Sequence, residues 1–284
     1  REHAIELGLT SRLRVEAQAE ILVFLRDKLF DLGLERYLPV GNPEKHLAAL
    51  HGVFDRARNE DVTPEQYLAF AEKLVAEAGD AAEKRDYAEG QLEVARAYGR
   101  YLELVFAAGR VDFGSQVALA LRLLRERPYL RREYQERFPW ILVDEFQDTN
   151  HAQFELIRLL AGTQRNITVV GDDDQSIYRW RGARVENLLD FLETFPGARE
   201  VLLVRNYRSG QAILDSAHRL IRFNDPARLE AQRGIDKRLI ADRTDADGAT
   251  FSGQVEHRAF LAARDQSDTV AAEIAQAIAA GRRA

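Results

Sequence analysis

The sequence predicts an α/β fold in which a parallel sheet follows a mostly α-helical N-terminal region. Two observations predict this fold. Apolar residues recur at helical spacing from residue 12 to about residue 110, and from residue 138 onward short apolar runs alternate with helical segments. Strands that alternate with helices form parallel sheets with helices on both faces, so we expect both faces of this sheet to be covered. The length of 284 residues suggests about two domains.

The N-terminal helices are predicted from apolar stripes and from residues that start or end a helix. Gly33 ends the first helix, and Thr63 followed by Pro64 is typical of an N-cap and a first helical residue. Val53 and Phe70 are among the residues expected to face the core. We interpret these stripes as core packing and assign them no catalytic role. The predicted helices cover residues 21–32, 47–57, 64–74 and 87–108.

The second half of the chain contains the predicted strands. Apolar runs at 141–143, 167–170 and 201–204 are expected to be parallel strands, and 255–261 is a candidate fourth. Residues 224–250 are expected to be irregular. Ligands of open α/β sheets bind outside the carboxyl ends of the strands, so the polar residues after each run matter most. The predicted helices of this half cover residues 152–160, 185–195, 212–223 and 267–279.

Composition excludes several classes of protein. The chain has no cysteine, which excludes disulfides, a thiol nucleophile and a thiolate zinc site. Its 40 basic and 46 acidic residues give a net charge of −6, which argues against a surface coated in positive charge but not against a local nucleic-acid groove. No apolar run is long enough to span a membrane and no leader is visible, so we expect a cytoplasmic protein.

Two acidic residues follow the first predicted strand. A carboxylate at Asp144 can hold Mg²⁺ largely through water, and the neighbouring Glu145 can orient or deprotonate an attacking water. The alternative is a group of acidic residues that only complements the dipole of the following helix. Residues 143–150, Val-Asp-Glu-Phe-Gln-Asp-Thr-Asn, are called the acidic string below.

Aromatic and basic residues alternate shortly after the second predicted strand. Tyr178, Trp180 and Arg181 offer rings that stack on bases and cations that follow phosphates, as a single-strand binding surface needs. Aromatic residues are more often part of a core, which is the alternative interpretation. Arginine neighbours favour the nucleic-acid role. Residues 178–181 are called the aromatic–arginine segment.

Three strings in this order resemble motifs of the UvrD/Rep/PcrA group of superfamily 1 DNA helicases. The acidic string is similar to that family's Walker B motif, residues 171–183 to its third motif, and Asn206-Tyr207-Arg208-Ser209 to its fourth. The resemblance is strong over about residues 110–216 and weaker over 12–110. It implies a P-loop (RecA-like) motor core that is incomplete in this chain.

The resemblance also implies domains and site roles. Residues 1–110 are expected to be an inserted helical subdomain (1B-like), 111–207 the C-terminal part of motor domain 1A, and 208–284 the start of motor domain 2A. ATP and Mg²⁺ are the expected cofactors. The implied roles are Asp144 for Mg²⁺, Glu145 for the hydrolytic water, Gln175 and Arg208 for the γ-phosphate, and Tyr207 for the adenine.

The implied partners are single-stranded DNA and duplex junctions. Tyr178, Trp180 and Arg181 are the expected DNA contacts. The family implies movement from 3′ to 5′, a place in DNA repair or recombination, and association with the bacterial nucleoid.

One part of the family pattern is missing from the 284 residues. They contain no G-x-x-x-x-G-K-[ST] loop, and the chain starts at Arg1 and has no methionine. We therefore expect an internal piece of a larger helicase, without ATPase activity by itself. In addition, Gly114-Ser115 departs from the acidic residue that often follows a Val-Asp-Phe signature such as residues 111–113.

Other functions stay open at this point. The chain could be the motor part of a helicase–nuclease of the AddA or RecB type. It could also be a non-catalytic helicase-like module that binds DNA whether or not nucleotide is present. A magnesium nuclease built from Asp144 and Asp172–Asp174 leaves the aromatic–arginine segment without a role.

Overall fold

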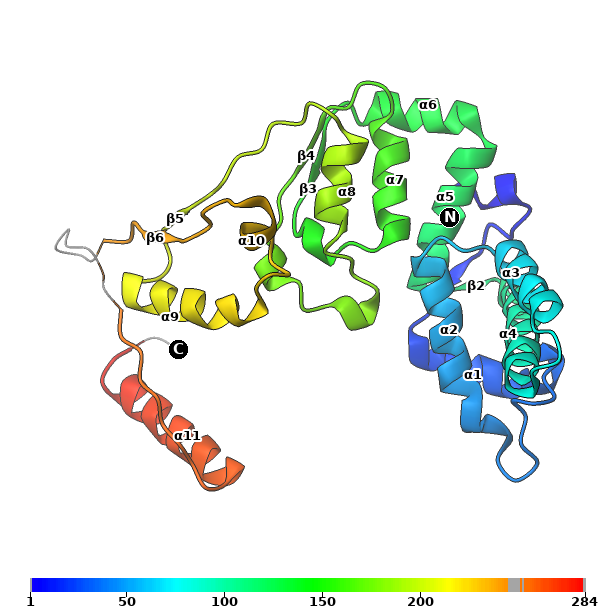
Figure 1. The fold of residues 1–284 in the computed structure, drawn as a ribbon, viewed down its shortest axis with the longest axis horizontal. Helices are drawn as coiled ribbons and strands as arrows, with labels where there is room; N and C mark the ends of the chain where they lie inside the picture. Colours follow the sequence, from blue (N-terminus) through cyan, green and yellow to red (C-terminus); the bar gives the residue numbers. More distant parts are fainter. Residues whose placement is uncertain (1, 245–250, 252, 283–284) are drawn as a thin grey trace. The chain divides into compact units, whose positions relative to one another are not determined.

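A computed structural model describes residues 2–244, 251 and 253–282 (Figure 1). The chain forms two compact units, Arg1–Ala198 and Arg199–Ala284, and each is described by itself. The finer division expected at 110/111 and at 207/208 stays a prediction.

The first part of unit 1 is helical, as predicted. Gly33 ends the first helical stretch in the left-handed conformation with φ 72°, which favours glycine. The Thr63 side chain accepts a hydrogen bond from the Gln66 N–H, which confirms the predicted N-cap. The elements are the α-helices α1 (Gln18–Asp27), α2 (Leu47–Asn59), α3 (Pro64–Glu77) and α4 (Ala82–Ala107), with 3₁₀ turns η1 (Ala4–Leu7), η2 (Leu29–Leu32) and η3 (Pro43–His46).

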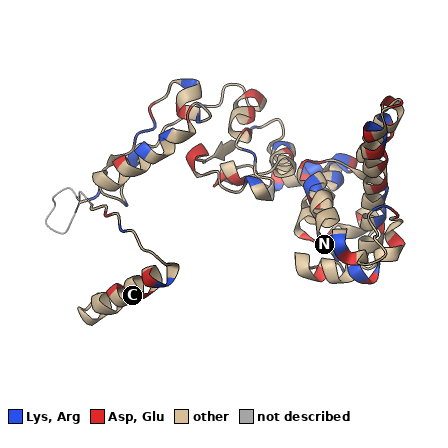
Figure 2. Ribbon diagram, turned by 60° about the horizontal axis from the view of Figure 1, so that its bottom comes forward, with Lys and Arg blue, Asp and Glu red and all other residues tan. Residues whose placement is uncertain are grey.

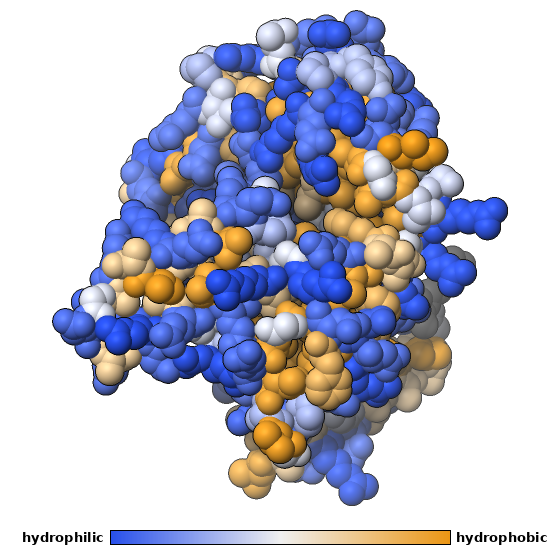
Figure 3. Space-filling model, turned by 90° about the vertical axis from the view of Figure 1, so that its right-hand side faces the viewer, coloured by the Kyte–Doolittle hydropathy of each residue, from blue (hydrophilic) through white to orange (hydrophobic). Residues whose placement is uncertain are grey.

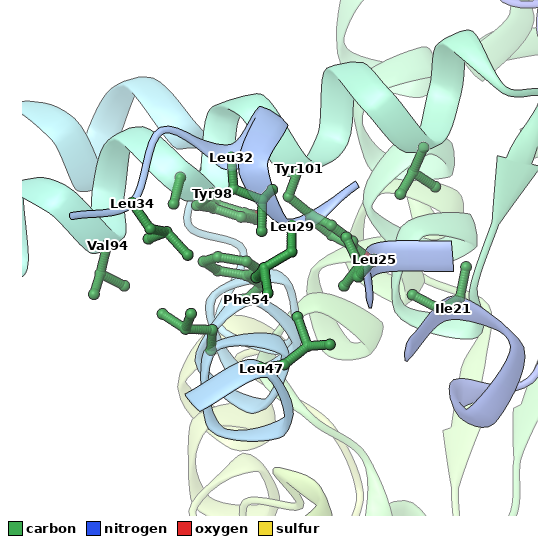
Figure 4. Packing of buried hydrophobic residues seen from close by; sticks show 13 residues of the cluster. Ile21, Leu25, Leu29, Leu32, Leu34, Leu47, Phe54, Val94, Tyr98 and Tyr101 are labelled. Atoms are coloured by element: carbon green, nitrogen blue, oxygen red, sulfur yellow. The ribbon is translucent and has the colours of Figure 1, made fainter. Parts of the chain in front are cut away.

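The core of these helices is built around one aromatic stack. The ring of Phe54 lies 5.5 Å from that of Tyr98 and 5.2 Å from that of Tyr101, with leucines of α1 and η2 closing over them (Figure 4). Two residues expected in the core are on the surface instead. Val53 is 41% exposed and Phe70 is 53% exposed. In each helix the next residue, Phe54 or Ala71, is the one that faces the core and is buried.

A short parallel pair of strands joins the two ends of the helical part. β1 (Arg14–Val15) pairs with β2 (Arg110–Val111), where the sequence pattern predicts only helix. Two-residue strands are too short to show an alternating pattern, so the pairing depends on tertiary contacts.

The region after β2 contains the predicted first sheet. β3 (Ile141–Val143) and β4 (Ile167–Val169) are adjacent and parallel, as expected. The expectation that both faces are covered is wrong for the described residues. α7 and α8 both pack on one face, while Leu142 on the other is 79% exposed. The remaining elements are α5 (Phe113–Glu126), α6 (Pro128–Arg137), η4 (Phe146–Asp148), α7 (His151–Ala161), η5 (Asp173–Gln175), η6 (Arg179–Arg181) and α8 (Asn187–Thr194).

Unit 2 differs most from the prediction. Residues 201–204 are not a strand, because the pairing partner, β6 (Ile240–Ala241), reaches only β5 (Arg205–Asn206). The candidate strand at 255–261 is also wrong. Within the stretch expected to be irregular lie β6 and the short helix α10 (Leu229–Arg233). The other helices are α9 (Gln211–Ile221), η7 (Arg222–Asn224) and α11 (Ala263–Ala279).

Basic and acidic residues are interspersed along the helices drawn in Figure 2. The face that the helical part shows in Figure 3 is mostly hydrophilic with scattered hydrophobic residues. Among the described residues, no helix combines the length and the apolar character needed to cross a membrane.

Candidate functional site

The acidic pair lies where β3 ends. Asp144 and Glu145 are both exposed, and the Asp144 carboxylate accepts a hydrogen bond from the Glu145 N–H at 3.0 Å. Glu145 has φ 52° and ψ 42°, a left-handed conformation that is uncommon for a residue with a side chain. This turn ends β3 and places both carboxylates at one edge of the sheet.

Gln147 connects the ends of the two strands. It is 1% exposed, and its Nε2 donates to Glu145 Oε2 at 2.7 Å. Its Oε1 accepts from the Asp172 N–H at 3.0 Å, just after β4. One buried amide therefore uses both of its polar atoms to fix the position of Glu145 relative to the second strand. Gln147 was not among the predicted site residues, although a glutamine between Phe146 and Asp148 in the acidic string was a usable signal.

Gln175 joins the same network. Its Nε2 donates to Asp172 Oδ2 at 2.8 Å, and Asp172 also caps η5 through the Asp174 N–H. A continuous path of hydrogen bonds therefore runs from Glu145 through Gln147 and Asp172 to Gln175. The structure brings these two predicted residues, Glu145 and Gln175, to the carboxyl ends of adjacent parallel strands, where ligands of open α/β sheets bind.

The aromatic–arginine segment follows directly. Trp180 is 74% exposed, and its ring lies 6.4 Å from that of the half-buried Tyr178 at an interplanar angle of 53°. The expected alternative, a tryptophan inside a core, does not apply. The predicted DNA contact of Arg181 lies outside the described side chains, although its backbone belongs to η6.

Tyr207 and Arg208 lie in unit 2, immediately after β5. Asn206 Oδ1 accepts from the N–H groups of Arg208 and Ser209 at 3.0 and 2.8 Å, which fixes a tight turn. Tyr207 is 66% exposed, and the Arg208 side chain is exposed too. Their expected convergence with Glu145 and Gln175 stays a prediction.

The side chains at the carboxyl ends of β3 and β4 include some of the ligands that a magnesium–nucleotide complex needs. Asp144 offers an exposed carboxylate at a strand end, and carboxylate oxygens are ligands that Mg²⁺ prefers. Ligand oxygens of Asp172, Asp173 and Asp174 also lie within 4.8 Å of one another, partly buried. Groups of acidic side chains as close as this are common without a bound ion, and we assign the three aspartates no metal.

A buried charged cluster lies at the start of α5. Asp112 accepts from Arg58 at 2.7 Å, from Tyr101 at 3.0 Å and from the Ser115 N–H at 2.7 Å. Burial penalises the Asp112 carboxylate, but its contacts with His51, Arg58 and Ser115 more than offset this and hold the pKa of Asp112 well below its usual range. Burial also raises the pKa of Tyr98 to about 12.

Comparison with known proteins shows the family of this chain. The family model of the UvrD/REP helicase N-terminal domain matches residues 1–196. DNA helicase II of Escherichia coli is 50% identical over 152 residues, which is 54% of this chain and 20% of that protein. The ATP-dependent DNA helicase PcrA of Leuconostoc citreum is 39% identical over 184 residues, 63% of this chain and 24% of that protein.

A third relative, the ATP-dependent DNA helicase Rep of Escherichia coli, is 44% identical over 130 residues, 46% of this chain and 19% of that protein. The chain thus spans about a fifth to a quarter of the length of these curated relatives. The match of the family model over residues 1–196, together with the small parallel sheets, identifies a helicase N-terminal domain. The chain belongs to the UvrD/Rep family of superfamily 1 helicases.

Proposed function

We propose that these residues form part of an ATP-dependent DNA helicase or translocase that moves along single-stranded DNA from 3′ to 5′. One observation supports this most. Glu145 and Gln175 are connected through Gln147 and Asp172, and the exposed Trp180 follows five residues after Gln175. The residue proposed to contact the γ-phosphate and the residue proposed to stack on a base are therefore five positions apart in the chain.

Each site residue has a proposed task. Asp144 would hold Mg²⁺, which neutralises charge on the phosphates when bound. Glu145 accepts a proton from the attacking water, and the Gln147 amide keeps its carboxylate in place for that step. Gln175 would hydrogen-bond the γ-phosphate, an interaction that is lost on hydrolysis.

Unit 2 would complete the nucleotide site. Arg208 would bind the γ-phosphate with its guanidinium, and Tyr207 would stack on the adenine. On the DNA side, Tyr178 and Trp180 would stack on bases, and Arg181 would pair with a phosphate. We also propose a role in DNA repair or recombination, which the family resemblance supports.

The catalytic part is tested by Glu145→Gln in a longer polypeptide that carries this chain together with a phosphate-binding loop. ATP turnover should fall about 10²- to 10⁴-fold, while single-strand binding remains, because only the general base is lost. Glu193→Gln, at an exposed position of α8, is the matched control. Turnover that stays at the wild-type level in Glu145→Gln contradicts the proposal.

The 284-residue chain alone gives the complementary test. Because its sequence has no phosphate-binding loop, we expect negligible magnesium-dependent ATPase activity but measurable, salt-sensitive binding of single-stranded DNA. If nucleotide leaves DNA affinity unchanged even in the longer polypeptide, a non-catalytic DNA-binding module explains the chain better.

A further inference from the structure

The C-terminal turn of α2 makes an unusual set of contacts. Four consecutive side chains, residues 58–61, each bind a different segment of the chain beyond residue 110. Asp61 has φ 57°, so the backbone reverses here and lets neighbouring side chains point to different partners. The pairs are Arg58 with Asp112 (2.7 Å), Asn59 with Asn150 (2.9 Å), Glu60 with Arg184 (3.7 Å) and Asp61 with Arg125 (2.5 and 2.9 Å).

Asn59 has the central place among the four. Its Oδ1 accepts from Nδ2 of Asn150, the last residue of the acidic string, and its Nδ2 donates to Asp55 at 3.3 Å. Its side chain also lies against Gly182, the residue that follows the aromatic–arginine segment. A Cβ at Gly182 would lie 3.3 Å from both Cβ and Nδ2 of Asn59, so a side chain there would crowd Asn59.

The acidic string and the stretch after the aromatic–arginine segment are also bonded to each other. The Thr149 carbonyl accepts from the Arg184 N–H at 3.0 Å and from Nδ2 of Asn187 at 2.9 Å. Asn187 is fully buried. Asn59 therefore contacts both sides of an ordered junction, and it does so from a helix whose other face packs in the core of the helical part.

We propose that Asn59 is a positioning residue that fixes the aromatic–arginine segment relative to the acidic string. Together with the Glu60–Arg184 ion pair, this side chain joins the helical part of unit 1 to the stretch that presents Trp180. The inference rests on the proposed DNA-binding role of Trp180 for its functional consequence, but the position of Trp180 is measurable without DNA.

The test uses the 284-residue chain with Trp140→Phe, which leaves Trp180 as the single tryptophan. In this background, Asn59→Ala should lower the steady-state fluorescence anisotropy of Trp180 and raise its quenching by acrylamide. The affinity for a fluorescent oligo-dT should fall about threefold to tenfold. This loss is smaller than the full contribution of one stacked base to the binding free energy. Asn150→Ser should do the same, because serine keeps the cap of α7 and lacks the amide donor that reaches Asn59.

Two control variants separate position from stability. Asn42→Ala changes an exposed asparagine of the same helical part. Asp61→Asn removes the charge that pairs with Arg125 and keeps a residue type that tolerates the left-handed conformation at this position. Neither should alter the Trp180 signals. If Asn59→Ala and Asn150→Ser both match Asn42→Ala, or if Asp61→Asn gives an equal change, the inference is wrong. If the wild-type chain does not bind oligo-dT, the DNA-binding proposal fails, while the anisotropy and quenching still decide the role of Asn59.

Discussion

Gln147 donates from Nε2 to Glu145 Oε2 at 2.7 Å while its other amide atom accepts from the backbone of Asp172. A buried side chain with only 1% exposure thus fixes an exposed carboxylate. This hydrogen bond restrains the Glu145 carboxylate, so Gln147 limits where the oxygen proposed to activate water can lie.

We therefore expect Gln147→Leu to lower ATP turnover at least about tenfold in a polypeptide that includes the phosphate-binding loop, because the general base loses its fixed position. DNA affinity should hardly change. Gln164→Leu, at an exposed position in the loop after α7, is the control. Steady-state kinetics in which kcat is unchanged and only the KM for ATP rises would show that Gln147 acts on binding rather than on the base.

The two tryptophans form a natural pair for testing base stacking. Trp180 is 74% exposed and Trp140 is 72% exposed, but only Trp180 belongs to the aromatic–arginine segment. Trp180→Ala should weaken oligo-dT binding by about 1–3 kcal/mol, and Trp140→Ala should have no measurable effect. Fluorescence anisotropy titrations at fixed salt measure both. Equal losses in the two variants would point to a general hydrophobic contribution instead of a stacking site.

Asp112 gives a prediction about pH. Its folded-state pKa lies below the ordinary value of 3.8, so its stabilising effect is complete above about pH 4 and is lost as pH falls through the lower, folded pKa. Asp112→Asn should destabilise unit 1 by about 3 kcal/mol at neutral pH, because Arg58 loses its buried partner. The difference from wild type should shrink as the solution becomes more acidic.

Hydrogen exchange of the α4 amides as a function of pH checks this. Asp80→Asn serves as the control, since Asp80 is fully exposed and its pair with Arg85 is a surface contact. If the difference in free energy of unfolding between wild type and Asp112→Asn stays constant from pH 7 to pH 2, the lowered pKa of Asp112 is contradicted.

The aromatic stack gives a prediction about stability. Phe54 is fully buried between Tyr98 and Tyr101, whereas its neighbour Val53 is 41% exposed. Phe54→Ala should cost about 3–5 kcal/mol through lost burial and a cavity. Val53→Ala should cost much less. Denaturant unfolding, monitored through hydrogen exchange of the α4 amides, measures the free energy of unfolding of both variants. Similar losses in the two variants would mean that α2 presents a different face to the core.

Much of the local structure was predictable because its causes are local. Thr63 and Pro64 start a helix by satisfying its first N–H groups, and Gly33 ends one because it tolerates a positive φ. The parallel pairing of β3 with β4 followed from the alternation of strand and helix. The acidic string and the aromatic–arginine segment were visible as motifs, and family membership follows from the comparison.

Other features depended on which segments meet. Residues 201–204 are as apolar as β3, yet they form no strand, because the described partner β6 pairs with Arg205 and Asn206, which directly follow them. The faces of β3 and β4 looked equivalent in sequence, but α7 and α8 cover only one of them.

The amino-acid order by itself determined where most helices and the first two parallel strands form, and which side chains follow those strands, since backbone preferences and motif spacing act over a few residues. Only the three-dimensional arrangement decided that Gln147 accepts from the N–H of Asp172, 25 positions away, and that Asn59, 91 positions from Asn150, touches it. Hydrogen bonds between distant residues depend on how helices pack, and no short pattern encodes that packing.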